Sequence, residues 1–267
     1  MLIRNNFQSH PFHLVFPSPW PINNSIGLLA VTSSFVLWAH SFEAAIYFVY
    51  LSIFLLVFSM NLWFRDIISE STYLGNHTLA VQRGINMGFA LFIISELFFF
   101  LSIFWSYFHS ALSPTIELGS EWPPLGIEAI NPFELPLLNT LLLLSSGVSV
   151  TYAHHCLIKG KRSGALNGLI FTVFLALCFT SLQGLEYIVS SFTISDGAFG
   201  SCFYLSTGFH GLHVIIGTIF LTTGLIRILY YHFTENHHLG LEASILYWHF
   251  VDVVWIFLYI AIYYWGS

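Results

Sequence analysis

Residues 85–109 read INMGFALFIISELFFFLSIFWSYFH, an almost unbroken run of apolar side chains in which Glu96 is the only acidic or basic residue apart from the terminal His109. Crossing the hydrocarbon core of a bilayer, roughly 30 Å thick, takes about 20 helical residues. The run exceeds that length, so it predicts a transmembrane helix.

The rest of the chain has the same apolar character. Its 267 residues are 56% hydrophobic and 7% charged, with a mean hydropathy of +0.77, values that are typical of membrane proteins and not of soluble domains. A net charge of −6 provides no basic surface for nucleic acid, which excludes that class of partner. Cys156, Cys178 and Cys202 have no paired spacing, so neither a disulfide framework nor a thiolate metal site is expected.

Six further stretches have a similar length and few charges. Together the predicted helices cover residues 22–39, 42–64, 85–109, 136–156, 166–189, 201–229 and 242–265. They predict an all-α polytopic membrane protein with seven transmembrane helices, in which residues 1–267 form a single membrane domain. Only a short turn around His40 separates the first two helices, so these should form an antiparallel hairpin.

The basic residues agree with this number of spans. With seven helices, every Lys and Arg falls on one side of the membrane: Arg4, Arg65, Arg83, Lys159, Lys161, Arg162 and Arg227. The opposite side carries Glu117, Glu121, Glu128, Glu134 and Asp196. Because Lys and Arg collect on the side from which insertion starts, the N-terminus is expected inside and the C-terminus outside.

Glu96 requires an explanation, because a carboxylate at the centre of a membrane helix costs about 2.5–3.5 kcal/mol on insertion scales. It could be a proton-relay carboxylate or a contact to a lipid headgroup. It could also be a neutral glutamic acid that is hydrogen-bonded within a helix bundle.

Several polar residues share one face of a predicted helix. His210 and His213 are three residues apart and continue into Gly217 and Gly224, a stripe that favours a close-packed seam between helices over a cofactor site. His249 and Asp252 repeat the spacing, and the simplest interpretation of these, as of His210, is polar bonding between helices.

Other polar residues lie at the expected helix ends. Gln183 and Glu186 form a polar pair toward the outer end of the fifth helix. The doublets His154-His155 and His237-His238 fall at inside ends, where contacts to lipid headgroups are more common than metal ligation. Arg83 and Arg227, with His77 near Arg83, are suited to anionic headgroups, although inside-positive topology alone also explains the two arginines.

Motifs of enzyme active sites are absent. The sequence contains no GxxxxGK[ST], GxSxG, HExxH or CxxCH. No catalytic residue and no metal ligand is therefore predicted in the chain itself.

Strings along the whole chain resemble subunit III of the haem-copper cytochrome c oxidases in its mitochondrial form. They are SPWP at 18–21, FRDI at 64–67, FIISE at 92–96, WPP at 122–124, PLLNT at 136–140, FTISDG at 192–197, TGFHGLHV at 207–214 and WHFVDVVW at 248–255. The strings occur in the family order from near the N-terminus to the last residues.

The resemblance implies a fold in which two helices form one group and five form another, with a phospholipid-filled cleft between them. It also implies a subunit without haem, copper or another cofactor of its own, since haem and copper belong to partner subunits. Subunit I and other oxidase subunits are the implied protein partners, and phospholipids are the implied ligands. The chain would thus support sustained proton uptake and oxygen reduction by an oxidoreductase complex without a catalytic centre of its own.

The same resemblance suggests lipid-binding residues. Carried over by motif, these are Glu96, His77, Arg83, His213 and Arg227, and Glu96 corresponds to the family's buried functional carboxylate. The implied location is the mitochondrial inner membrane, with the N-terminus in the matrix and the C-terminus in the intermembrane space.

Two other functions compete with this interpretation. A proton or ion channel based on Glu96 would require more acids or histidines along one pore, and spans one, two and four offer none at mid-depth. A membrane metalloenzyme would require His210, His213 and His249 to converge on one ion.

Overall fold

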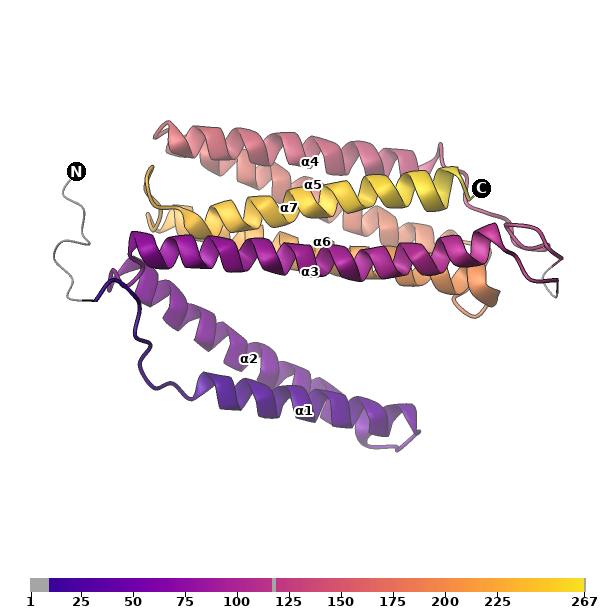
Figure 1. The fold of residues 1–267 in the computed structure, drawn as a ribbon, viewed down its shortest axis with the longest axis horizontal. Coiled ribbons are helices and arrows are strands. Elements are labelled where there is room, and N and C mark those ends of the chain that lie inside the picture. Colours follow the sequence, from indigo (N-terminus) through magenta and orange to yellow (C-terminus); the bar gives the residue numbers. More distant parts are fainter. Residues whose placement is uncertain (1–9, 117–118, 267) are drawn as a thin grey trace. The chain divides into compact units, whose positions relative to one another are not determined.

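The computed structural model describes residues 10–116 and 119–266, and within these ranges its regular structure is helical, with no strand. Seven helices are each long and apolar enough to cross a membrane (Figure 1). They are α1 Trp20–Ala39, α2 Ala45–Thr72, α3 Leu79–Leu112, α4 Leu135–Ile158, α5 Arg162–Val189, α6 Gly197–Leu229 and α7 Leu239–Leu258, and α7 continues as the π-helix η3 Tyr259–Tyr264. The predicted all-α fold with seven potential transmembrane helices is confirmed.

The helices α2 and α3 extend beyond the apolar stretches that predicted them. The polar residues 65–72 continue α2, and α3 already begins at Leu79. Polar side chains do not by themselves end a helix that has left the bilayer core. The chain departs from helical geometry in the connection between α2 and α3, where Gly75 adopts a φ of 67°. Hydropathy therefore indicates the length inside the membrane, and backbone preference determines where the helix ends.

The packing of the chain divides it into two compact units, residues 1–85 and 86–267. In the first unit, α1 and α2 form the expected hairpin. Its polar contacts join the two helices along their length: Trp20 Nε1 donates to Asp66 Oδ2 at 2.6 Å, Ser59 Oγ donates to Asn24 Oδ1 at 2.8 Å, and the Ser34 and Ser52 hydroxyls are 3.1 Å apart. The prediction of one membrane domain over 1–267 stays a prediction.

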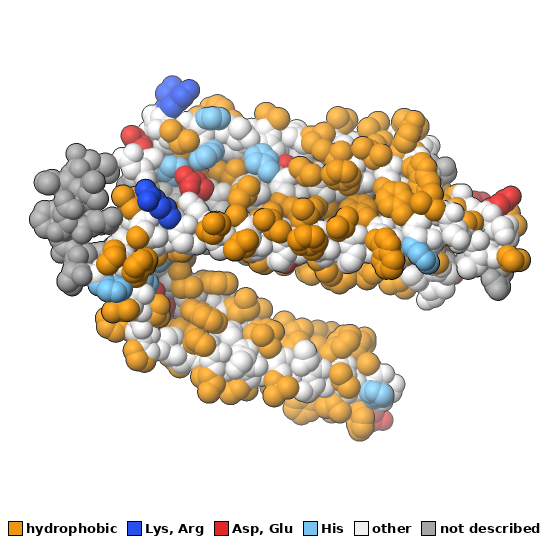
Figure 2. All heavy atoms as spheres, in the orientation of Figure 1, with side chains coloured by type: hydrophobic (Ala, Val, Ile, Leu, Met, Phe, Trp, Pro, Cys, Tyr) orange, Lys and Arg blue, Asp and Glu red, His pale blue; other side chains and the backbone are white. Residues whose placement is uncertain are grey.

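The second unit contains most of α3 together with α4–α7, and α7 is its most deeply buried helix. Trp248 and Trp255 of α7 are fully buried. The Trp255 ring meets the Phe179 ring of α5 edge to face, with centroids 4.8 Å apart, a geometry favoured between aromatic rings. Figure 2 shows hydrophobic side chains along the outer sides of these helices, as a hydrocarbon environment requires.

The Lys and Arg side chains of the second unit gather at one end, where Glu235 and Glu242 also lie. At one end, Arg162 donates from Nε to the Ile228 carbonyl at 3.3 Å and from Nη2 to the Leu229 carbonyl at 3.1 Å, which joins the start of α5 to the end of α6. Lys159 and Lys161 lie in the α4–α5 connection at this end, and Arg227 lies in the last turn of α6. At the other end, Glu121, Glu128, Glu134 and Asp196 lie in or next to the connections α3–α4 and α5–α6. Arg4 and Glu117 lie outside the described residues.

Candidate functional site

Glu96 and His213 meet inside the second unit, although 117 residues separate them in the sequence. Glu96 lies on α3 and His213 on α6, and Oε2 of the acid is 2.8 Å from Nε2 of the imidazole. The Glu96 side chain is 24% exposed and that of His213 is 9% exposed. The intramembrane carboxyl therefore has a buried partner on one side and an opening toward its surroundings on the other.

The hydrogen bonds of His213 define the proton content of this pair. Its Nδ1 lies 2.7 Å from the carbonyl oxygen of Phe209, and because a carbonyl can only accept, Nδ1 carries a hydrogen. A hydrogen bond between Nε2 and Glu96 Oε2 at 2.8 Å then requires one further proton. It belongs either to a neutral acid beside a neutral imidazole or to an imidazolium beside a carboxylate. Both forms have zero net charge, which reduces the penalty of burying ionisable groups in an apolar medium.

Aromatic rings surround His213. The Phe100 ring meets it edge to face with centroids 5.0 Å apart, and the Tyr247 ring of α7 stacks on it at 6.2 Å with an interplanar angle of 13°. Phe92 of α3 in turn stacks on Tyr247 at 6.4 Å. These rings hold the imidazole in one orientation within apolar surroundings.

Arg227 lies far from the pair, at the end of α6. His213 and Arg227 are 14 residues apart on this helix, which corresponds to roughly 21 Å at the α-helical rise. The Arg227 guanidinium lies 4.3 Å from the centre of the Phe233 ring, and its Nη1 is so close to Gly240 that a Cβ there would come within 2.6 Å. Burial and the charge of Arg227 lower the pKa of the neighbouring His232 below its usual range.

His77 and Arg83 belong to the first unit. The His77 carbonyl accepts a hydrogen bond from Gln82 Nε2 at 2.8 Å, and the His77 ring faces the His13 ring at 5.9 Å. Arg83 is exposed near the start of α3. Of the five predicted lipid-binding residues, the structure thus joins Glu96 to His213 by a hydrogen bond and places Arg227 at another level of the second unit.

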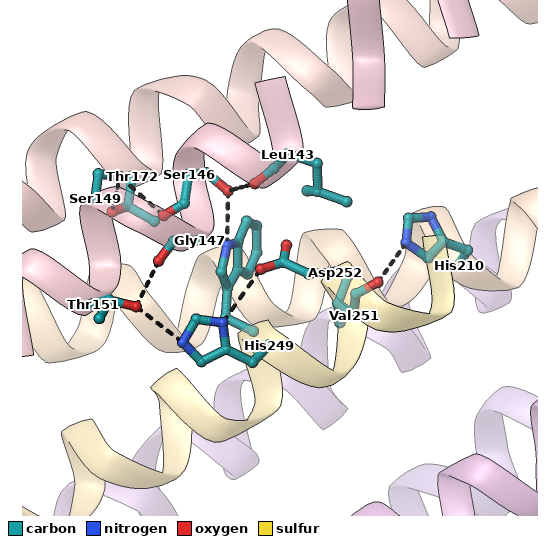
Figure 3. A network of polar contacts seen from close by, with 11 residues as sticks. Leu143, Ser146, Gly147, Ser149, Thr151, Thr172, His210, His249, Val251 and Asp252 are labelled. Atoms are coloured by element: carbon teal, nitrogen blue, oxygen red, sulfur yellow. Dashed lines mark hydrogen bonds and ion pairs between the residues drawn. The ribbon is translucent and has the colours of Figure 1, made fainter. Parts of the chain in front are cut away.

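The residues expected to bond between helices have separate partners, as Figure 3 shows. His210 Nε2 donates to the Val251 carbonyl of α7 at 3.2 Å. Nε2 of His249 is 3.3 Å from the Thr151 hydroxyl of α4, and its Nδ1 is 3.4 Å from Asp252 Oδ2. Because His210, His213 and His249 have different neighbours, they do not form the common metal centre that the metalloenzyme hypothesis requires.

The sequence did not indicate the polar cluster around Glu186, whose side chain is almost fully buried. Its Oε1 accepts hydrogen bonds from Tyr263 OH at 2.5 Å and from Gln183 Nε2 at 3.0 Å. Asn139 of α4 donates to Gln183 Oε1 at 3.2 Å. The spacing of Gln183 and Glu186 identified the pair, but nothing in the sequence indicated its partners on α4 and η3.

Comparison with known proteins identifies the family of the chain. The sequence model of the family described as "Cytochrome c oxidase subunit III" matches residues 10–267. The chain is 67% identical over 244 residues to "Cytochrome c oxidase subunit 3" of Neurospora crassa, covering 91% of both chains. It is 58% identical over 249 residues to the protein of that name from Mycosarcoma maydis, covering 91% of this chain and 90% of the other. The protein of that name from Yarrowia lipolytica is 58% identical over 244 residues, covering 91% of both chains. The chain therefore belongs to the cytochrome c oxidase subunit III family.

Proposed function

We propose that this chain is a structural subunit of mitochondrial cytochrome c oxidase that binds neither haem nor copper. It packs against the catalytic subunit I, holds phospholipids and supports sustained proton uptake and oxygen reduction by the complex. The observation that carries this proposal is the family match over residues 10–267, together with relatives, one of them 67% identical, that are named as a subunit of that oxidase.

The apolar surface of the second unit is suited to such an assembly. Large side chains on α3 are widely exposed, among them Phe98 at 64% and Trp105 at 69%. Apolar residues at membrane depth are covered by lipid tails or by the helices of partner subunits. A subunit of this kind stabilises the complex by packing and needs no chemistry of its own.

The Glu96–His213 pair is the proposed polar contact between this surface and the proton-uptake side of the complex. Its carboxyl is partly exposed, and its shared proton can move between Oε2 and Nε2 over 2.8 Å without a change in net charge. The proposed lipid sites also include His77, Arg83 and Arg227, because cationic side chains at helix ends attract anionic headgroups. The cleft between a two-helix and a five-helix group stays a prediction.

The proposed location is the mitochondrial inner membrane, with the basic end of the second unit in the matrix. This follows from the inside-positive rule applied to Lys159, Lys161, Arg162 and Arg227. It places the N-terminus in the matrix and the C-terminus in the intermembrane space.

Glu96→Gln tests the proposed role of the pair. The glutamine amide can still donate to His213 Nε2, so we expect normal assembly and a nearly normal initial rate of oxygen reduction. The amide cannot release a proton, so we expect the variant complex to lose activity in fewer turnovers than the wild type. The measurement is oxygen consumption followed through prolonged turnover.

Glu121→Gln is the matched control, because Glu121 is an exposed acid in the α3–α4 connection. It should retain the wild-type lifetime. Complete loss of assembly with Glu96→Gln, or an unchanged lifetime, would contradict the proposed role of Glu96. Purification of the chain without other oxidase subunits would contradict the proposed function as a whole.

A further inference from the structure

Two histidines and a glutamate from different segments converge at the basic end of the second unit. His154 lies in the last turns of α4, His238 directly precedes α7, and Glu242 lies in the first turn of α7. One nitrogen or oxygen atom of each residue lies within 4.8 Å of those of the other two. Among residues 10–116 and 119–266, this is the one group of three such side chains with this geometry.

The backbone determines which nitrogen of His238 faces the group. Nδ1 of His238 lies 3.0 Å from the Thr234 carbonyl oxygen, so Nδ1 carries the hydrogen and, in the neutral ring, Nε2 carries a lone pair. Metal-binding histidines are oriented in the same way, with the other ring nitrogen donating to a backbone carbonyl or a carboxylate.

The contact between His238 and Glu242 brings two acceptor atoms together. His238 Nε2 is 3.2 Å from Glu242 Oε1, yet this nitrogen has no hydrogen-bond partner and its residue is only 6% exposed. A nitrogen lone pair and a carboxylate oxygen at this distance repel each other unless a cation lies between them. A proton on Nε2, which would make an ion pair with the carboxylate, or a bound metal ion would each relieve this repulsion.

His154 supplies the third ligand. Its Nε2 is also buried without a hydrogen-bond partner, and its ring meets the His238 ring edge to face with centroids 5.5 Å apart. Buried ring nitrogens without partners are unfavourable, and one bound ion would satisfy both His154 and His238.

We propose that His154, His238 and Glu242 bind one divalent transition-metal ion of the Zn²⁺ type, with a fourth position open to water. Two imidazoles and one carboxylate form a ligand set that suits Zn²⁺, whereas Ca²⁺ and Mg²⁺ prefer oxygen ligands. Tetrahedral coordination with bonds of about 2.1 Å separates neighbouring ligand atoms by about 3.4 Å, close to the 3.2 Å between His238 Nε2 and Glu242 Oε1. The ion would join the end of α4 to the start of α7.

The test measures Zn²⁺ binding to the full-length chain, purified in mild detergent with the subunits that copurify with it. After removal of loosely held metal by a chelator, equilibrium dialysis against radioactive Zn²⁺ compares the wild type with Glu242→Gln and His238→Gln. We expect the wild type to hold one more Zn²⁺ than either variant, with affinity at this site reduced at least ~100-fold in the variants. X-ray absorption at the zinc edge should show nitrogen and oxygen ligands in the wild type.

His155→Gln is the matched control, because His155 adjoins His154 but is exposed and outside the group. It should bind Zn²⁺ like the wild type. The Glu242 side chain is 43% exposed, so Glu242→Gln keeps the fold and remains informative if His238→Gln does not assemble. The proposal would be overturned if the wild type and Glu242→Gln bound Zn²⁺ equally, or if His155→Gln lost as much Zn²⁺ binding as Glu242→Gln. Neither result depends on the role of Glu96.

Discussion

At the scale of single residues, two acids within the helices of the second unit, one partly exposed and one buried, are stabilised in different ways. Glu96 shares a proton with one imidazole and keeps an opening to its surroundings. Glu186 is 2% exposed, and its Oε1 accepts hydrogen bonds from Tyr263 and Gln183. Two hydrogen bonds to Oε1 offset part of the cost of burying Glu186, whose Oε2 has no hydrogen-bond partner among the described residues. We therefore interpret Glu186 as a structural residue.

Tyr263→Phe tests the structural role of the Glu186 cluster. The change removes the hydroxyl that donates to Glu186 Oε1 and leaves the aromatic ring. We expect a loss of about 1–3 kcal/mol in stability, the usual result of removing one partner of a buried polar group. The measurement is a lower midpoint of thermal unfolding for the purified complex.

Tyr230→Phe is the control for this change, because the Tyr230 side chain is largely exposed. Its unfolding midpoint should match that of the wild type. An equal midpoint for Tyr263→Phe would mean that the cluster does not stabilise the fold.

At the scale of elements, the seam between α6 and α7 depends on small residues. A Cβ at Gly217 would lie 2.9 Å from Cε3 of Trp248, and one at Gly224 would lie 3.1 Å from Cδ1 of Leu241. Trp248 is fully buried, and its Nε1 donates to the Ser146 hydroxyl at 2.9 Å, so its ring cannot move away easily. The seam predicted from the positions of His210, His213, Gly217 and Gly224 is confirmed for the two glycines.

Gly217→Ala should therefore weaken the packing of α6 against α7. We expect a loss of about 1–3 kcal/mol from overpacking, offset by less than about 1 kcal/mol from the better helix propensity of alanine. A lower yield of assembled complex and a lower unfolding midpoint are the observables.

Gly211→Ala is the matched control on the same helix, since a Cβ there meets nothing within 4 Å. It should be neutral or slightly stabilising within this chain. If Gly217→Ala and Gly211→Ala had the same stability, the close packing at Gly217 would not determine how α6 packs against α7.

At the scale of the whole molecule, the seven helices that can span a membrane are an odd number, so the proposed orientation puts the two termini on opposite sides. The connections at one end of the second unit carry Lys159, Lys161 and Arg162, and those at the other end carry Glu121 and other acids. This separation is the signal that membrane insertion follows, and it supports the proposed orientation with the basic end in the matrix.

Single cysteines test this orientation. In mitochondria with a ruptured outer membrane, a membrane-impermeant maleimide should label Glu121→Cys at once, because the proposed orientation puts the α3–α4 connection in the intermembrane space. Lys161→Cys should react only after the inner membrane is opened. Both original side chains are exposed, so accessibility depends on the side of the membrane.

The wild-type chain is the background control, since Cys156 is buried and Cys178 and Cys202 are partly buried. The opposite order of labelling would reverse the proposed orientation. Equal labelling of both variants before the membrane is opened would contradict a transmembrane arrangement between residues 121 and 161.

The sequence alone determined the class of fold, the number of potential spans and the asymmetry of charge. These properties depend on short stretches such as residues 85–109, because the free energy of transferring a helix into hydrocarbon is a sum of contributions from its individual residues. Glu96 stood out for the same reason, as an acid inside an apolar run. The family strings then related this residue to a lipid-binding or proton-related role.

Only the tertiary structure decided which polar residues meet. His213 lies 117 residues from Glu96, and Glu242 lies in another helix than His154. No periodicity within one helix can encode such a pairing, because it depends on how the helices rotate and pack against each other. The doublets His154-His155 and His237-His238, expected to make separate headgroup contacts, thus contribute His154 and His238 to one group with Glu242. A polar atom that loses water in the packed bundle needs a protein partner, and that partner can come from a distant part of the chain.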